Sequence, residues 1–307
     1  MELKADHVTL TLCILAVTLT LTSANVVTFS IGDVNAELQT WGTVAFERTN
    51  GTTDLEYSRF TMRVSEISVL DKSEAVLASH PFKMEKQEYK IDKWEGSKFM
   101  GLKAGARRLY SGSLGDLSGF VDVFVYLFTQ GGPVDFIKED YGEAVNVDDA
   151  LVVIKLDNVT KCSACNKAAF VDLKIEITTK SQLGMRAVTQ DKTGGSLEIV
   201  HIPASAGIFL GNKAVIDGDR QEMVKGFPEV EQGSGKTDII VRIPTFSSAA
   251  SYGLFVRQDR RTVEQAKKEN GTLGAIIESS AVQNRKDIKF IMALMLCLAC
   301  FFYAPVV

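Results

Sequence analysis

The stretch Phe170-Val-Asp-Leu-Lys-Ile-Glu-Ile-Thr178 decides the fold, because apolar and polar residues alternate without a break from Val171 onward. Successive side chains of a β-strand point to opposite faces of the sheet, so this period of two predicts a strand with one buried and one wet face. The stretch Asp238-Ile-Ile-Val-Arg-Ile243 repeats the pattern with Ile240 as its exception. One-sided strands of this kind are typical of antiparallel sheets.

Similar runs rich in Val, Ile, Phe and Thr recur along the chain, and few stretches have helical periodicity. We expect strands over 42–48, 60–71, 89–92, 99–102, 119–129, 150–156, 168–179, 185–189, 196–202, 209–216, 237–243 and 252–256. Turn signals rich in Gly, Asn, Asp and Pro separate many of them. The sequence therefore predicts an all-β fold made of one or two antiparallel, jelly-roll-like β-sandwich domains.

The number of expected strands exceeds what one small sandwich needs, so we expect two domains. The first β-sandwich would span residues 25–160 and the second residues 161–258. Residues 259–279 are charged with little apolar content, which indicates a short stalk that is either helical or extended.

The chain begins with a pattern typical of a secretory signal peptide over residues 1–24. Val8–Leu21 is apolar and carries no charge, and Thr22-Ser23-Ala24 supplies small residues at a plausible cleavage point. We therefore expect the mature chain to start at Asn25 outside the cell.

The last residues, 280–307, have the layout of a glycolipid (GPI) anchor signal. The small residues Ser279-Ser280-Ala281 precede a polar spacer, Val282–Lys289, and an uncharged apolar tail, Phe290–Val307. Such signals have a spacer of roughly 8–12 residues and a tail of roughly 10–20. Ser279 is then the expected attachment residue, on the extracellular face of the cell membrane. A single retained transmembrane helix is the alternative, although no basic residue follows the tail to hold a cytoplasmic end.

Two cysteines lie between these terminal segments, Cys162 and Cys165, and an oxidising compartment favours a disulfide between them. A redox motif would need a βαβ setting, and a structural zinc site would need four ligands. Three acceptor sequons for N-glycosylation begin at Asn50, Asn158 and Asn270, as expected of exposed loops in a secreted protein.

Few residues point to bound ions or catalysis. Asp217, Asp219 and Glu222 are weak candidates for a calcium site, but Asp-Gly dipeptides are typical of solvated turns. The same interpretation applies to Asn146–Asp149. Gly233–Thr237 lacks the full phosphate-loop pattern and precedes a strand, so we expect a hairpin turn. No cofactor is expected.

Surface charge narrows the range of partners. The chain carries 34 Lys and Arg against 38 Asp and Glu, a net charge of −4, which argues against a nucleic-acid surface. Lys103, Arg107 and Arg108 form a small basic patch that could meet an acidic glycan, although a solvated loop is the plainer interpretation. His80 and His201 resemble strand-end or core residues more than metal ligands.

The stretches Tyr57–Asp71 and Ala168–Ile177 resemble secreted and membrane-attached proteins of cnidarian skeletal organic matrices. This resemblance covers a small part of the chain, and it implies a matrix role in biomineralisation. We expect a GPI-anchored, β-rich extracellular glycoprotein that serves a matrix, adhesion or ligand-binding role and is not an enzyme. Its partners would be the membrane, through its anchor, and an extracellular protein, glycan or mineral. A surface-anchored hydrolase that uses carboxylates is the alternative.

Overall fold

The computed structural model describes residues 26–259, apart from 49–58, 85, 93–97, 113, 142–143, 181–183, 193–194, 204 and 234, together with Lys268. Several expectations fall on residues outside this range. They are the signal peptide, the sequons at Asn50 and Asn270, all but two residues of the stalk, the attachment residue Ser279 and the C-terminal tail.

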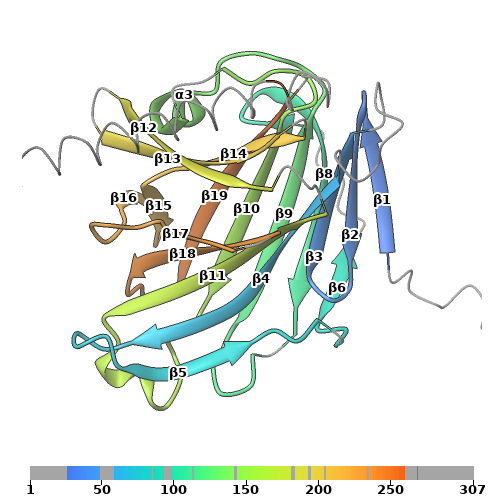
Figure 1. Cartoon of the computed structure of the whole chain (residues 1–307). Helices are drawn as coiled ribbons and strands as arrows, with labels where there is room; N and C mark the ends of the chain where they lie inside the picture. The colour runs from blue at the N-terminus through green and yellow to red at the C-terminus, as the bar shows by residue number, and fades with distance from the viewer. Residues whose placement is uncertain are drawn as a thin grey trace, which may run out of the picture. The chain divides into compact units, whose positions relative to one another are not determined.

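Residues 26–259 fold into two antiparallel β-sheets, which confirms the all-β prediction (Figure 1). The first sheet has the strand order β1 (Val26–Ile31), β2 (Val34–Gln39), β3 (Thr43–Arg48), β4 (Arg59–Leu70), β11 (Phe170–Thr179), β18 (Lys236–Pro244) and β17 (Glu229–Gln232), with β5 (Val76–Pro81) also beside β4.

The second sheet is larger and supplies the other layer of the sandwich. Its order is β12 (Arg186–Lys192), β13 (Gly195–Ile202), β14 (Ala206–Leu210), β19 (Ala249–Gln258), β10 (Ala150–Asp157), β9 (Phe120–Phe128), β8 (Leu102–Ser111) and β6 (Tyr89–Asp92). Three short strands join its margins: β7 (Lys98–Phe99) pairs with β8, and β15 (Lys213–Ile216) pairs with β19 and with β16 (Asp219–Glu222).

Strand β11 behaves as its alternating sequence predicts. Val171, Leu173 and Ile175 are buried, whereas Asp172 and Lys174 on the opposite face are half-exposed. The strand lies between β4 and β18, so its inward residues pack at the centre of the first sheet.

The main core lies between the inner faces of the two sheets. From the first sheet it contains Leu173 and the stacked rings of Phe46 and Phe60, whose centroids are 5.3 Å apart. From the second it contains residues such as Val152 and Leu254. Burying apolar surface of this kind is the main force that holds two sheets together.

The expected boundary at residue 160 is not a division between two separately packed sandwiches. Strand β4 precedes this position and β11 follows it, yet they pair along most of their length. Strands β10 and β19 pair in the same way across it in the second sheet. Residues on both sides of the boundary therefore share one core, and Asp259 ends the compact unit they form.

Some element predictions were wrong. The basic segment expected to be a loop is strand β8, because small residues such as Ala104 and Ala106 pack inside its alternating pattern. Residues 99–102 are not one strand: Met100 and Gly101 form a hairpin turn between Phe99 at the end of β7 and Leu102 at the start of β8. Residues 209–216 are divided at Gly211-Asn212 into β14 and β15. The pairing strands β1 and β2 were not predicted.

A smaller second core lies on the outer face of the second sheet. Helix α3 (Asp135–Tyr141) and its flanking loop bring Val134, Ile137 and Tyr141 onto Leu151 and Phe255. The Tyr141 hydroxyl donates a hydrogen bond to the Gly253 carbonyl at 2.8 Å. The α3 segment thus covers part of this face and leaves the rest open.

Within the described ranges, no helix has the length and apolarity that crossing a bilayer requires.

Candidate ligand-binding groove

The open part of the outer face of the second sheet carries a groove with a volume of about 380 Å³. Its floor is one cross-strand row, Phe124 on β9, Val153 on β10 and Gly253 on β19, which pair in register. Gly253 has no side chain to fill the space above it. The floor is therefore apolar and is open above Gly253.

An aromatic wall borders this floor. The rings of Phe99 and Tyr126 lie 4.6 Å apart between centroids, and burial raises the pKa of Tyr126. Beside Phe99, Met100 and Gly101 form the two-residue turn of the β7–β8 hairpin with φ angles of 45° and 89°. Bulky side chains rarely occupy this left-handed region, yet Met100 lines the groove with 69% of its surface exposed.

Four charged residues line the groove: Asp140, Lys155, Lys213 and Arg220. Arg220 forms ion pairs with both Asp140 and Glu139. Burial raises the pKa of Asp140, and the hydrogen bond from Arg220 opposes that shift only in part. Asp140 and Arg220 thus hold each other in place at one side.

The two lysines are less constrained. Lys155 pairs with Asp157 at 2.9 Å, but its side chain is 41% exposed, and surface ion pairs contribute little to stability. Among the described residues, no carboxylate oxygen lies within ion-pair distance (4.0 Å) of the Lys213 ammonium. Three cations and one anion therefore line the groove. Lys213 acts on Asp140 through its charge without a direct ion pair, so its ammonium group can still meet a ligand.

The predicted basic patch does not exist as a single surface. Arg107 points to the inner face of β8, where its guanidinium lies 5.2 Å from the centre of the Phe29 ring. Arg108 points to the outer face, lies over the Tyr110 and Phe124 rings and binds the buried Asp122 at 2.8 Å. It therefore fixes one edge of the groove floor.

The calcium candidates do not assemble into a site. Asp217 accepts hydrogen bonds from the backbone N–H groups of Ser247, Ser248 and Ala249 at 2.7–3.1 Å. These bonds, that from Ser247 above all, lower the pKa of Asp217 to about 2. Asp219 and Glu222 lie at opposite ends of β16. In the described part of the chain, no three metal-ligating side chains gather.

The interpretation of Asn146–Asp149 as a solvated turn is wrong for Asp149, which is 2% exposed. Its carboxylate accepts a hydrogen bond from the Asn146 N–H at 2.8 Å and faces Arg257 at 3.4 Å. Burial, opposed by these contacts, raises the pKa of Asp149 to about 6. This pair joins the loop beyond α3 to β19.

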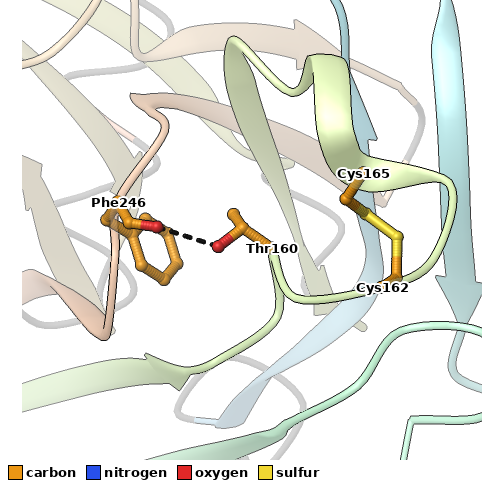
Figure 2. The surroundings of a disulfide bond; sticks show 4 residues. All are labelled: Thr160, Cys162, Cys165 and Phe246. Atoms are coloured by element: carbon orange, nitrogen blue, oxygen red, sulfur yellow. Dashed lines mark hydrogen bonds between the residues drawn. A yellow bond between two sulfur atoms is a disulfide. The ribbon is translucent and has the colours of Figure 1, made fainter.

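Cys162 and Cys165 are joined by a disulfide in the connection between β10 and β11, with Cα atoms 5.0 Å apart (Figure 2). A short 3₁₀ helix, η1 (Cys165–Lys167), follows, so the setting is not the βαβ unit of a redox motif. In the adjacent sequon, Asn158 is half-buried with φ at 56°. The Thr160 hydroxyl of that sequon donates to the Phe246 carbonyl at 2.8 Å.

The remaining motifs occupy structural positions. His80 lies 3.2 Å from a Glu88 oxygen, and His201 lies 3.7 Å from an Asp259 oxygen. The Gly233 N–H donates a hydrogen bond to the Lys236 carbonyl between β17 and β18, which confirms the turn prediction.

Comparison with known proteins gives no family. No protein-family model and no curated protein matches the sequence. One solved structure is similar over 77% of this chain, an α-N-acetylgalactosaminidase, NagBb, from Bifidobacterium bifidum in complex with GalNAc. The identity is 8% and the TM-score 0.38, and the match spans 36% of that enzyme's chain. At this level the likeness carries no functional argument.

Proposed function

We propose that this chain is an extracellular, membrane-anchored β-sandwich glycoprotein that binds a ligand in the groove on the outer face of its second sheet. The groove is the observation that carries the proposal. Ligand sites are typically concave, mostly apolar and marked by a few charged groups, with volumes of roughly 300–1,000 Å³. The space above Phe124, Val153 and Gly253 has these properties.

The extracellular setting rests on the sequence. The expected signal peptide, the sequons and the C-terminal anchor signal agree with one another, and the disulfide suits an oxidising compartment. A matrix or adhesion role, including the mineral matrix that the resemblance implies, is one setting in which such a groove would operate.

Enzymatic release tests the anchor. Cells that express the full chain are treated with a phosphatidylinositol-specific phospholipase, and the protein in the medium is measured. We expect release of the wild-type protein and loss of surface display when Ser279 and Ser280 are both replaced by Leu, because the attachment region must be small. Retention on phospholipase-treated cells would favour a transmembrane helix instead.

A thermal-shift screen tests the groove. Residues 25–259 contain every described strand and both cores, so this fragment is suitable for measurements in solution. A compound that binds the native groove raises the Tm of the fragment. We expect Val153→Trp, which fills the floor, to abolish that increase. An Ile240→Trp variant on the first sheet should retain it.

One observation favours the alternative of a carboxylate-dependent hydrolase. Asp140 lines the groove, and burial raises its pKa in the way a general acid requires. Asp140 is, however, the single carboxylate among the described lining residues, and Arg220 already binds it. Hydrolysis of a glycosidic or ester substrate that Asp140→Asn abolishes would establish this alternative.

A further inference from the structure

We propose that the ligand of this groove is a small amphipathic organic anion, with a flat apolar body and one carboxylate, sulfonate or sulfate group. This inference rests on the proposed function and names the chemical class of its ligand. Three properties of the groove lead to it: the apolar floor, the aromatic wall and the excess of cations in the lining.

The floor and wall select an apolar body. Phe124 and Val153 form the base, and Tyr126 stands beside Phe99 on one side. Aromatic side chains favour offset or edge contacts with a flat partner. A sugar ring is a poorer fit at the floor itself, because the side chains of Phe124 and Val153 offer no hydrogen bond to a hydroxyl group that loses water above them.

The hairpin tip supports the same conclusion. Met100 occupies a left-handed turn position at which Gly or Asn would relieve backbone strain. Its side chain nevertheless stands exposed beside the groove. Methionine is flexible and polarisable and adapts to varied apolar partners. We infer that Met100 forms an adjustable wall over a bound apolar group.

The cations select the sign of the head group. Arg220 is already engaged with Asp140 and Glu139, so the charge available to a ligand comes first from Lys213. Lys155 adds to it, because its side chain is 41% exposed although it pairs with Asp157. Lys155 pairs in register with Ser251, which pairs with Val215 two residues after Lys213. The two ammonium groups therefore belong to neighbouring rows of one surface. An anion there would receive charge-assisted hydrogen bonds.

Two fluorescent probes of nearly the same shape separate the head group from the body. The anion 8-anilinonaphthalene-1-sulfonate carries a sulfonate, and N-phenyl-1-naphthylamine has the same rings without it. We expect both to bind the 25–259 fragment with one-to-one stoichiometry. Replacing Lys155 and Lys213 together by Gln should weaken the sulfonate probe about tenfold and change the neutral probe less than about twofold.

Control variants make the result specific. Lys72→Gln removes one charge from an exposed turn of the first sheet and should leave both probes unaffected. Val153→Trp should weaken the binding of both probes. Met100→Gly, which relieves the strain of the turn and removes the Met100 side chain from the groove, should also weaken the binding of both probes, and it should not lower the Tm. Met84→Ala removes an exposed methionine elsewhere and serves as the match for Met100→Gly.

The outcomes separate the two proposals. If the double lysine variant weakens both probes equally, or neither, the anionic head group is wrong while the groove remains a site. If neither probe binds, or Val153→Trp and Met100→Gly change nothing, the groove itself fails and the proposed function with it. If a sulfated disaccharide displaces the sulfonate probe at lower concentration than naphthalene-2-sulfonate does, the ligand is an acidic glycan and the proposed class is overturned.

Discussion

The outer faces of the two sheets use their charges in opposite ways. On the first sheet, charged side chains pair across neighbouring strands: Arg63 with Glu176 at 2.9 Å, Lys174 with Asp238 at 3.2 Å, and Arg242 with Asp172 at 2.7 Å. On the second sheet, helix α3 covers one part and an aromatic groove occupies the rest, where Lys213 lacks such a partner among the described residues. On a face whose charged side chains already form ion pairs with one another, few charged groups are available to bind a ligand.

Exposure alone therefore does not identify a binding surface. Both faces are reached by solvent, and both carry lysine and arginine. In the part of the chain that the structure describes, the second face combines a hollow, an apolar floor and incompletely paired cations. If the first face stabilises the fold and the second binds, substitutions on the first face should lower the free energy of unfolding more than substitutions in the groove.

Glu176 on β11 should matter most to stability. It receives hydrogen bonds from Arg63 and an ion pair from Lys236; burial opposes its ionisation, but these contacts outweigh burial and lower its pKa. Glu176→Gln leaves Arg63 without a counter-ion, and we expect a loss of about 2–3 kcal/mol in urea unfolding. Glu229→Gln on exposed β17 should change stability by less than about 0.5 kcal/mol. Equal losses in the two variants would refute the structural role of the first face.

Asp149 gives the covered part of the second sheet a pH dependence of its own. Its folded pKa of about 6 lies above the ordinary value of 3.8, so the folded state holds the proton more tightly than the unfolded state. The stabilisation is complete below the unfolded pKa and is lost as the pH rises through 6. Relative to Asp149→Asn, the wild-type fragment should gain about 2 kcal/mol between pH 7 and pH 4.

The test uses the difference in the free energy of unfolding between the wild-type fragment and Asp149→Asn at each pH. Carboxylates with lowered pKa values, such as Glu176, lose stabilising contacts when they are protonated, and this destabilises both proteins in acid. Denaturant midpoints measured at several pH values supply it. A constant difference across the range would show that Asp149 is not the buried acid described here.

Replacing Arg242 by lysine keeps the positive charge and tests whether the geometry of the guanidinium group matters on the first face. Its guanidinium binds both oxygens of Asp172 at 2.7 and 2.8 Å and lies 4.5 Å from the centre of the Phe227 ring. Lysine cannot reproduce the planar fork or the stacking, so Arg242→Lys should cost about 1 kcal/mol. Lys174→Arg, which keeps a simple ion pair on the same face of the first sheet, is the matched control, and a larger loss there would contradict the role of the fork.

The smallest effect on stability is expected in the groove. Lys213→Gln should change the free energy of unfolding by less than about 0.5 kcal/mol, because no ion pair of the described residues is broken. The same substitution should weaken the binding of the sulfonate probe. A stability loss as large as that of Glu176→Gln would mean that Lys213 is structural, and the contrast between the faces would disappear.

Sequence patterns predicted the fold much better than the site. The alternation of Val171–Ile175 shows directly in the burial of β11, because these positions face either the core or solvent. Glu176 departs from it, because Arg63 and Lys236 cover its side chain on the outer face. Strand β8 was missed because Ala104, Gly105 and Ala106 look like a loop until the neighbouring strands bury them. The boundary at residue 160 was wrong because pairing between distant segments, such as β4 with β11, leaves no local pattern.

The groove could not be predicted for the same reason. Phe124, Val153 and Gly253 are far apart in the chain and become neighbours only through the strand register. The one local signal was Met100-Gly101, where a bulky apolar residue occupies a turn. The weak calcium candidates failed because a sequence does not show which carboxylates, as with Asp217, are already bound by backbone N–H groups.

The most direct test of the central claim is a chemical-shift titration of the isotope-labelled 25–259 fragment with 8-anilinonaphthalene-1-sulfonate. We expect saturable shifts concentrated at Phe124, Tyr126, Val153 and Gly253, with the amides around Asp172 and Glu176 unchanged. Shifts centred on the first sheet, or spread evenly over both faces, would contradict it.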